Sequence, residues 1–435
     1  MLEGTWAQLV SRGRAQELAG KYAEADTTFR AALALAEQGS GWQDTARTLA
    51  YVARVDQTLG KLDEAELLYG RALAMDQAHQ SWLEAAAIQL NLSRIARTRG
   101  QPEHALPLCE EATGTFRSLL GPEHPFVADG LDTLASVQMV LGKDLEASAT
   151  FEQSLAIREK AAPPDLLKLA ATLSNFAALQ VTLGQYREAE LSYRRALTLR
   201  EGRLDGAHPE LAETRLGLMV LYRNERQFSK ADVLAALVLP ALTASLGADH
   251  ARVANASEEI AALYEQEGRV DEAEPLLRRA LEIYQRAFGA DYGQTAVVLT
   301  NLSALEVDRK NYTAAEGLCK QALQVSKKAV GTEHPEYAAI LHKLGRVYAL
   351  EGRYEESAAS LEQALRIREK VLGVNHPSVA RWEMDYAFAL RKIHRDKQAS
   401  QIEARAQQVL ADAARDSGAA YRVDVRDLER AGKPI

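Results

Sequence analysis

Apolar residues recur along the chain at steps of three and four, in segments separated by short polar breaks. One such stripe consists of Tyr337, Leu341, Leu344 and Tyr348, which is the spacing of one face of an amphipathic helix. A second stripe at helical spacing begins after Gly352. A Gly inside a helix costs about 1 kcal/mol relative to Ala, whereas it suits a left-handed helix cap. The pattern therefore predicts two helices, termed A and B, joined by a tight turn.

This pair of helices recurs at a fixed register. The turn residue, which is Gly in seven copies, is followed five residues later by Ala, or by Ser in one copy. We expect the helices to cross closely at this small residue, where a Leu would overpack by roughly 1–3 kcal/mol. Successive turns are 40 residues apart twice and then 42 residues apart seven times, which gives ten repeats. The turn residues are Gly20, Gly60, Gly100, Gly142, Gly184, Arg226, Gly268, Lys310, Gly352 and His394.

The linkers between repeats indicate where each A helix begins. Four of them contain a His-Pro step, and Pro suits a first helical position because its φ is preset and it has no N–H to leave unpaired. Asp165 stands at the same point of a linker without this step, where we expect it to cap the next helix. The His-Pro steps are His124-Pro125, His208-Pro209, His334-Pro335 and His376-Pro377.

A single pair of helices cannot bury its apolar stripes, but stacked pairs form a continuous core. The sequence therefore predicts an all-α solenoid over residues 1–414, followed by a polar tail over residues 415–435. The Trp6-x-x-Leu9 opening, the Gly-x-aromatic-x-x-Ala turn and the Ala near the end of helix B resemble tetratricopeptide repeats. The 42-residue period with its Leu-Gly-x-x-His-Pro linker resembles the kinesin light chain subfamily. This resemblance implies a right-handed superhelical solenoid, a scaffold or adaptor that binds an extended peptide or partner segment along its A helices.

Composition narrows the classes of partner. The 52 basic and 60 acidic residues give a net charge of −8, which argues against a nucleic-acid-binding protein. Cys109 and Cys319 occupy inward positions of helix B five repeats apart, and buried free thiols fit a reducing compartment. No apolar run approaches the roughly 20 residues of a membrane span, so we expect no membrane insertion. These features predict a cytoplasmic protein, or a periplasmic or secreted one if a leader was removed before residue 1.

Motifs that would indicate an enzyme are absent from the sequence. It contains no Gly-x-Ser-x-Gly, no Gly-x-x-x-x-Gly-Lys-Ser/Thr, no His-Glu-x-x-His and no Cys-x-x-Cys. The linker histidines would be separated by helix packing distances of about 8–10 Å, whereas zinc ligands converge at about 2.1 Å. We therefore predict a non-enzymatic protein without a cofactor or metal.

Candidate binding residues come from helix A, nine residues before each turn. By resemblance to kinesin light chains, Asn at this place contacts a cargo peptide, which makes Asn91, Asn175 and Asn301 candidates. A side-chain amide suits this role because it offers both a donor and an acceptor to an extended backbone.

Basic residues lie one helical turn further along the same face. Arg14, Arg54 and Arg94 occupy this register in repeats 1 to 3, and Arg97 follows one turn beyond Arg94. With Tyr51 and Asn91 they predict an electropositive groove for an acidic or carboxylate-bearing peptide. Lys343 and Arg346, with His342, predict a second basic spot. The alternative interpretation is that these are solvated charges balanced by nearby acids, each pair contributing only about 0–1 kcal/mol.

The helix B of repeat 6 departs most from the pattern. Residues 233–242 are apolar on every face, and Pro240 falls inside the helix, where Pro costs roughly 3 kcal/mol or more. We expect a kinked helix that is buried more deeply than its neighbours. The alternative is a hinge or a homodimer contact. This alternative belongs to a second functional hypothesis, a regulatory sensor or assembly subunit that changes superhelix pitch or dimerises on ligand binding.

Overall fold

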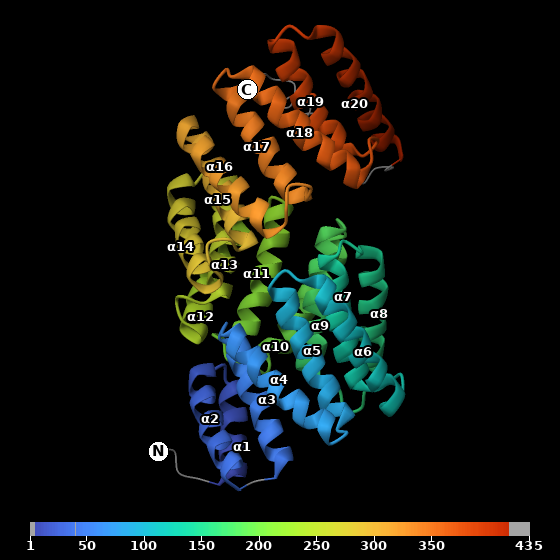
Figure 1. Cartoon of the computed structure of the whole chain (residues 1–435), viewed down its shortest axis with the longest axis vertical. Coiled ribbons are helices and arrows are strands. Elements are labelled where there is room, and N and C mark those ends of the chain that lie inside the picture. The colour runs from blue at the N-terminus through green and yellow to red at the C-terminus, as the bar shows by residue number, and fades with distance from the viewer. Residues whose placement is uncertain (1–4, 40, 417–435) are drawn as a thin grey trace. The chain divides into compact units, whose positions relative to one another are not determined.

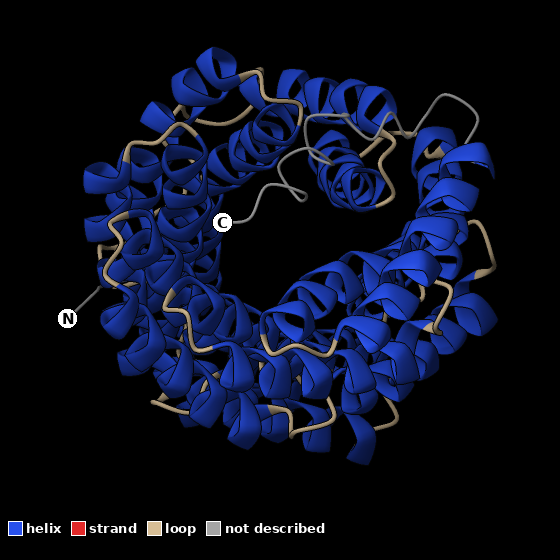
Figure 2. Cartoon of the chain, turned by 90° about the horizontal axis from the view of Figure 1, so that it is seen from above, coloured by secondary structure: helices blue, strands red, loops and turns tan. Residues whose placement is uncertain are grey.

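A computed structural model describes residues 5–39 and 41–416 of the chain. Within these residues all regular secondary structure is helical, and short loops join the helices (Figures 1 and 2). The A helices are α1 (Trp6–Leu18), α3 (Trp42–Thr58), α5 (Trp82–Thr98), α7 (Pro125–Val140), α9 (Leu166–Thr182), α11 (Pro209–Asn224), α13 (Ala251–Gln266), α15 (Gly293–Asp308), α17 (Pro335–Leu350) and α19 (Pro377–Lys392). The B helices are α2 (Tyr22–Gly39), α4 (Leu62–Ala78), α6 (Pro102–Leu120), α8 (Asp144–Lys160), α10 (Tyr186–Glu201), α12 (Phe228–Leu246), α14 (Val270–Phe288), α16 (Tyr312–Ala329), α18 (Tyr354–Leu372) and α20 (Asp396–Asp416).

The turn between helices A and B has the predicted left-handed backbone. Gly352 has φ of +80°, which costs Gly little because it has no Cβ. The three turn residues that replace Gly adopt the same conformation, with φ of +58° at Arg226, +61° at Lys310 and +62° at His394. The register therefore holds where the glycine is lost.

The linker histidines cap the A helices, which begin at the predicted His-Pro steps. The Nδ1 atom of His124 accepts a hydrogen bond from the backbone N–H of Phe126 at 3.2 Å, and the His-Pro steps at 208, 334 and 376 repeat this contact. Asp165 caps α9 by accepting from the N–H of Lys168 at 3.1 Å. Each cap supplies an acceptor to an N–H group that has no partner inside its helix.

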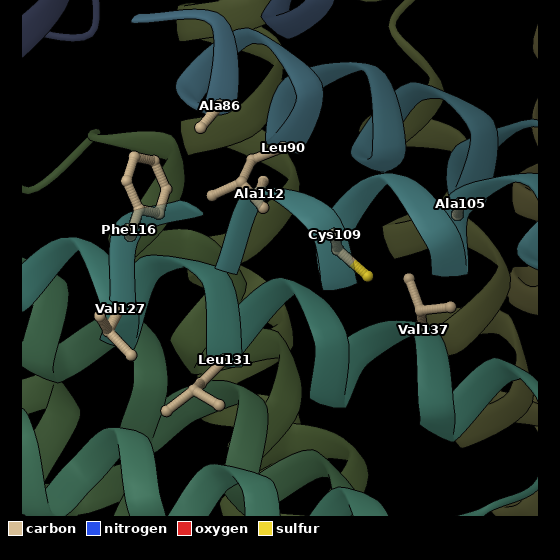
Figure 3. Packing of buried hydrophobic residues seen from close by; sticks show 9 residues of the cluster. All are labelled: Ala86, Leu90, Ala105, Cys109, Ala112, Phe116, Val127, Leu131 and Val137. Carbon is tan, nitrogen blue, oxygen red and sulfur yellow. The ribbon is translucent and has the colours of Figure 1, made fainter. Parts of the chain in front are cut away.

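The core forms between neighbouring helix pairs. Figure 3 shows one cluster, in which residues of α5, α6 and α7 meet around the Cys109 thiol. Cys109 and Cys319 are both buried free thiols, and burial raises the pKa of Cys109 to about 11. Ala105 and Ala315, at the predicted helix crossings, are fully buried. The predicted stacking of amphipathic pairs is confirmed.

Helix α12 differs from our expectation of deeper burial. It runs unbroken through Pro240, and it leaves Val233 65% and Leu237 46% exposed. Its buried residues lie at helical spacing on one side, because it packs against α11 as other B helices pack against their A helices. By length and composition alone, α12 would also suffice to cross a membrane, although no apolar run in the sequence seemed long enough.

The chain divides into two compact units, residues 1–263 and 264–435. Within unit 1, contacts join repeats that are distant in sequence: α12 packs against α2, and the Nε2 atom of His250 lies 2.6 Å from the carbonyl oxygen of Thr58. A Cβ at Gly20 would lie 3.3 Å from the His208 ring. The expected tail lies largely outside the described residues, beyond the end of α20 at Asp416.

Candidate functional site

Four A helices of unit 1, α3, α5, α7 and α9, border a cavity of about 470 Å³, which we term the large cavity. Side chains from α6 and α8 complete its wall. Five of the residues singled out from the sequence lie together in its lining. They are Arg54, Asn91, Arg94, Arg97 and Asn175.

Arg94 and Arg97 are the cations of the large cavity without an acidic partner. Arg94 donates from Nη1 to the Asn91 Oδ1 atom at 3.0 Å and from Nε to the Thr133 hydroxyl at 3.2 Å. The Nε atom of Arg97 is buried and has no hydrogen-bond partner. In the described part of the chain neither guanidinium forms an ion pair, and burial, together with Arg94, lowers the pKa of Arg97. Guanidinium donors without a protein partner are groups that can form charge-assisted hydrogen bonds to a carboxylate or phosphate.

Arg54 is held differently from the other two arginines. Its Nε and Nη2 atoms donate to the two carboxylate oxygens of Glu17 at 2.7 and 2.6 Å, and its guanidinium lies 5.2 Å from the Tyr51 ring centroid. Tyr51 stacks in turn on Phe29, with ring centroids 5.2 Å apart. Glu17 neutralises Arg54, and together they form a rigid part of the wall. The row of unpaired arginines that the sequence predicts along this register is therefore interrupted at Arg54.

The two amides that line the large cavity, Asn91 and Asn175, differ in burial and in hydrogen bonding. Asn91 is half-buried and uses its carbonyl oxygen on Arg94, which leaves its NH₂ group available. Asn175 is exposed on α9. Behind it, the Phe151 and Phe176 rings pack 5.8 Å apart in the core. The amides therefore lie on a rigid surface.

The wall opposite the arginines contains an ion network that the sequence reasoning missed. Arg158, from the last turns of α8, donates to Asp129 at 2.8 Å and to Asp132 at 2.6 Å, and Lys168 pairs with Asp129 at 2.5 Å. Burial disfavours the charged form of Asp129, but Lys168 and Arg158 outweigh it and lower the pKa of this carboxyl. At Asp132 burial prevails and raises the pKa.

These residues share registers that could have been found from the sequence. Asp129 and Lys168 lie on the same helical face as Asn91, four and seven residues further towards the start of helix A. Arg158 replaces the apolar side chains of Phe116 and Leu242, which occupy its place in two other repeats. The same position also holds Asp76, Arg200 and Arg368, so a recurrent charge on an inward face of helix B was the available signal.

A second cavity of about 210 Å³, the small cavity, lies between α3, α4 and α5 and shares Arg54, Ala87 and Asn91 with the large one. Its further lining includes Trp42, Arg47, Tyr51, Asp76 and Glu84. Trp42 stacks on His79 with centroids 3.9 Å apart.

The remaining candidates lie in unit 2. Asn301 on α15 and Lys343 on α17 are half-buried, Arg346 is exposed, and burial lowers the pKa of Lys343. His342 is buried, stacks on Trp382 at 4.3 Å and lies 2.8 Å from an Asp385 oxygen. Burial lowers the pKa of His342 and thereby disfavours its charged form, although the Asp385 hydrogen bond opposes this. Within the described ranges, no group of three His, Cys, Asp or Glu side chains is placed to hold a metal ion.

Comparison with solved structures shows similarity to other helical repeat proteins. A putative kinesin light chain from Podosopora anserina with nearly identical repeats is 24% identical, with a TM-score of 0.42 over 48% of this chain and 98% of that one. BtubC (BKLC) from P. vanneervenii is 25% identical, with a TM-score of 0.45 over 52% and 91%. A Rap protein complexed with competence and sporulation factor is 14% identical, with a TM-score of 0.50 over 77% and 99%.

A family model matches the chain, whereas no curated protein does. The tetratricopeptide repeat family matches residues 7–78, 84–160, 127–202, 249–310, 294–370 and 347–412, well over half of the chain. With ten in-register helix pairs in the same frame, the chain belongs to the tetratricopeptide repeat family.

Proposed function

We propose that the chain is a non-enzymatic scaffold that holds an extended, acidic or carboxylate-bearing peptide segment along α3, α5, α7 and α9 of unit 1. Tetratricopeptide repeats generally mediate protein–protein interaction, so the family supports a binding role. The observation that carries the finer proposal is the pairing of Arg94 with Arg97, two adjacent guanidiniums without a carboxylate partner among the described residues.

The electrostatics of the large cavity support an anionic ligand. Removing a guanidinium from water without pairing it is costly, and burial lowers the pKa of Arg97 accordingly. A ligand carboxylate would supply charge-assisted hydrogen bonds to the unused donors. On the opposite wall Asp129 and Asp132 are already paired with Arg158 and Lys168, so they do not repel this carboxylate as free charges would.

The amides support a ligand in extended conformation. An extended peptide presents N–H and C=O groups along its length, and a side-chain amide can pair with both. Asn91 has its NH₂ group available, and Asn175 lies two repeats further along the same lining. We expect the carboxylate to be fixed by Arg94 and Arg97 and the flanking backbone by these amides.

The test is a selection of random displayed dodecapeptides on the whole chain and on the double variant Arg94→Ala/Arg97→Ala. Wild type is expected to enrich peptides with an Asp, a Glu or a free C-terminal carboxylate, and the variant is expected to bind those peptides at least tenfold more weakly. Arg117→Ala is the matched control, because Arg117 is exposed on α6 and lies outside the lining. Equal affinity of wild type and the double variant, with circular dichroism unchanged, would overturn the proposal.

A second candidate is self-association through residues 233–242. It is supported by the exposed apolar side chains Val233 and Leu237, which lie one helical turn apart on α12. Sedimentation velocity over a hundredfold range of concentration tests it, with Val233→Glu/Leu237→Gln as the variant. A concentration-dependent dimer that the variant abolishes would support this candidate, and a monomer at every concentration would exclude it.

A further inference from the structure

We infer that the small cavity binds a cationic side chain, an ammonium or guanidinium group, of the same peptide whose carboxylate is held in the large cavity. This inference rests on the proposed function and adds the charge pattern of the ligand: a Lys or Arg next to an acidic group. Three observations support it: the Asp76 carboxylate is buried without an ion-pair partner, Arg47 and Glu84 beside it are not paired with each other, and aromatic rings line the cavity.

Asp76, near the end of α4, is the central group. Only 4% of the residue is exposed, and it lines the small cavity. The Asp76 carboxylate forms neither a hydrogen bond nor an ion pair with the other described residues, although the charge of Arg47 acts on it, whereas buried carboxylates are ordinarily paired. Burial and, secondarily, the charge of Glu84 raise the pKa of Asp76 to about 6. A cation placed against this carboxylate would remove the cost of burying it.

The charges around Asp76 stand at two helix A positions that form an ion pair between neighbouring repeats at two other places in unit 1. Lys168 pairs with Asp129 at 2.5 Å across two neighbouring A helices, and Arg252 pairs with Glu213 at 3.0 Å in the same register.

In repeats 2 and 3 this register holds Arg47 and Glu84, and no ion pair joins them. Both are exposed and line the small cavity, and the charge of Arg47 acts on Asp76 without an ion pair between them. The small cavity therefore has two carboxylates free to contact a ligand.

The remaining wall favours an organic cation over a metal ion. Trp42 and Tyr51 present aromatic rings to the small cavity, and such rings attract ammonium and guanidinium groups. Both rings are fixed, Trp42 by His79 and Tyr51 by Phe29. Two carboxylates do not make up the ligand set of a hard divalent cation, which takes six or more oxygens.

The two cavities are adjacent, since Arg54, Ala87 and Asn91 line both. One peptide can therefore place opposite charges in the two sites without leaving the groove. The Glu17–Arg54 pair lies between them and is neutral as a unit, so it does not oppose either charge. The expected ligand carries a basic and an acidic residue a few positions apart.

The first test uses the peptides selected on wild type. We expect Lys or Arg to be enriched at a fixed spacing from the acidic residue, and we expect Asp76→Asn to weaken these peptides at least fivefold. Asn preserves the shape of the buried side chain, and Glu64→Gln is the matched control, because Glu64 is exposed on α4 outside the lining. Arg47→Gln is expected to strengthen binding, because it removes the competing cation.

The second test does not depend on an identified peptide. We would titrate the Asp76 carboxyl by NMR with N-acetylarginine methylamide and with its neutral citrulline analogue. The arginine probe is expected to lower the pKa of Asp76, and the citrulline probe is expected to leave it unchanged. Equal shifts with both probes, or the same shift with sodium or calcium chloride at matched ionic strength, would overturn the inference.

The outcomes separate this inference from the proposed function. Acidic peptides without Lys or Arg enrichment, whose affinity is lost in Arg94→Ala/Arg97→Ala but kept in Asp76→Asn, would overturn the cationic site and leave the proposed function standing. If no peptide is enriched at all, both proposals fail. Enrichment of the basic residue together with its loss in Asp76→Asn supports both.

Discussion

The A helices of unit 1 and of unit 2 share the same repeat frame, but their polar side chains are paired differently. In unit 1, Arg94 and Arg97 line a cavity and form no ion pair with the described residues. In unit 2, Arg346 occupies the register of Arg94 and is exposed, His342 on the same helix stacks on Trp382 and bonds to Asp385, and the Arg368 guanidinium lies 4.5 Å from the same Trp382 ring. The repeat frame is the same in both, so side-chain size and pairing decide whether polar side chains of the A helices line a cavity or are covered by their neighbours.

Loss of the buried cation in unit 1 should have the largest effect. Arg158 is 4% exposed and compensates Asp129 and Asp132, so Arg158→Met leaves Asp132 without its ion-pair partner and Asp129 with Lys168 alone. We expect the free energy of unfolding to fall by about 3–5 kcal/mol. Urea unfolding followed by circular dichroism measures it, with exposed Arg117→Met as the control. A loss no larger than that of the control would mean that this wall of the cavity is solvated.

The second-largest loss of stability is expected from adding a side chain at Gly217 in helix A of repeat 6. Gly217 stands where Asn91 and Asn175 stand in their repeats, and a Cβ there would lie 2.5 Å from the Tyr193 ring. Gly217→Ala should therefore destabilise by about 1–3 kcal/mol. Gly70→Ala is the control: nothing lies within 4 Å of its Cβ, and Ala should stabilise that helix by up to about 1 kcal/mol. Thermal shifts of the same sign in both variants would argue against the tight contact.

An ion pair between repeats of unit 2 should give a pH-dependent effect of roughly 1–2 kcal/mol. Hydrogen bonds from Arg353 and then Lys320 lower the pKa of Glu316 to about 2, and its side chain is 13% exposed. The stabilisation is complete above the unfolded pKa of roughly 4.3 and is lost as pH falls towards 2.

The variant Glu316→Gln should therefore be less stable than wild type at pH 7, and the difference should shrink below about pH 4. Denaturant unfolding at a series of pH values measures this, with exposed Glu355→Gln as the control. A difference that stays constant from pH 7 to pH 3 would contradict the assigned pairing.

The smallest effect on stability is expected from the buried imidazole of His342 in unit 2. Burial lowers the pKa of His342 in the folded chain, although the Asp385 hydrogen bond opposes this. Below the unfolded pKa of about 6.5 the unfolded chain gains a proton that the folded imidazole resists, so stability falls as pH decreases.

We expect wild type to lose up to about 1 kcal/mol more than His342→Gln between pH 7.5 and pH 5.5. Melting temperatures at the two pH values measure this, with exposed His104→Gln as the control. Identical pH dependence of wild type and His342→Gln would show that the imidazole is free to protonate on this face.

The repeat frame could be predicted from the sequence because it depends on local residues. The left-handed turn, the helix start at the His-Pro step and the small residue at the helix crossing each follow from the stereochemistry of a few neighbours, and the structure confirms them at Gly352, Pro125 and Ala105. Helix α12 was predicted wrongly because periodicity alone does not say which side of an all-apolar helix meets a partner; Val233 and Leu237 are exposed.

The sequence brought together several residues that line one cavity, but it did not predict how they are paired. Arg54 and Arg94 share a register, yet only Arg54 meets a carboxylate, because Glu17 lies 37 residues away on the neighbouring A helix. Asp76 stands in helix B and was not considered, since its position is defined only by the stacking of three helices. The contact of His250 with Thr58 joins residues 192 positions apart, and no local pattern encodes it.

The most direct test of the central claim is a double-mutant cycle on one selected peptide. Its affinity, measured by fluorescence anisotropy, would be compared with that of the same peptide with its acidic group converted to an amide, on wild type and on Arg94→Ala/Arg97→Ala. If the arginines bind the carboxylate, either change alone weakens binding at least tenfold and the two together weaken it little further. Independent, multiplicative losses would contradict the account, because they would place the carboxylate away from Arg94 and Arg97.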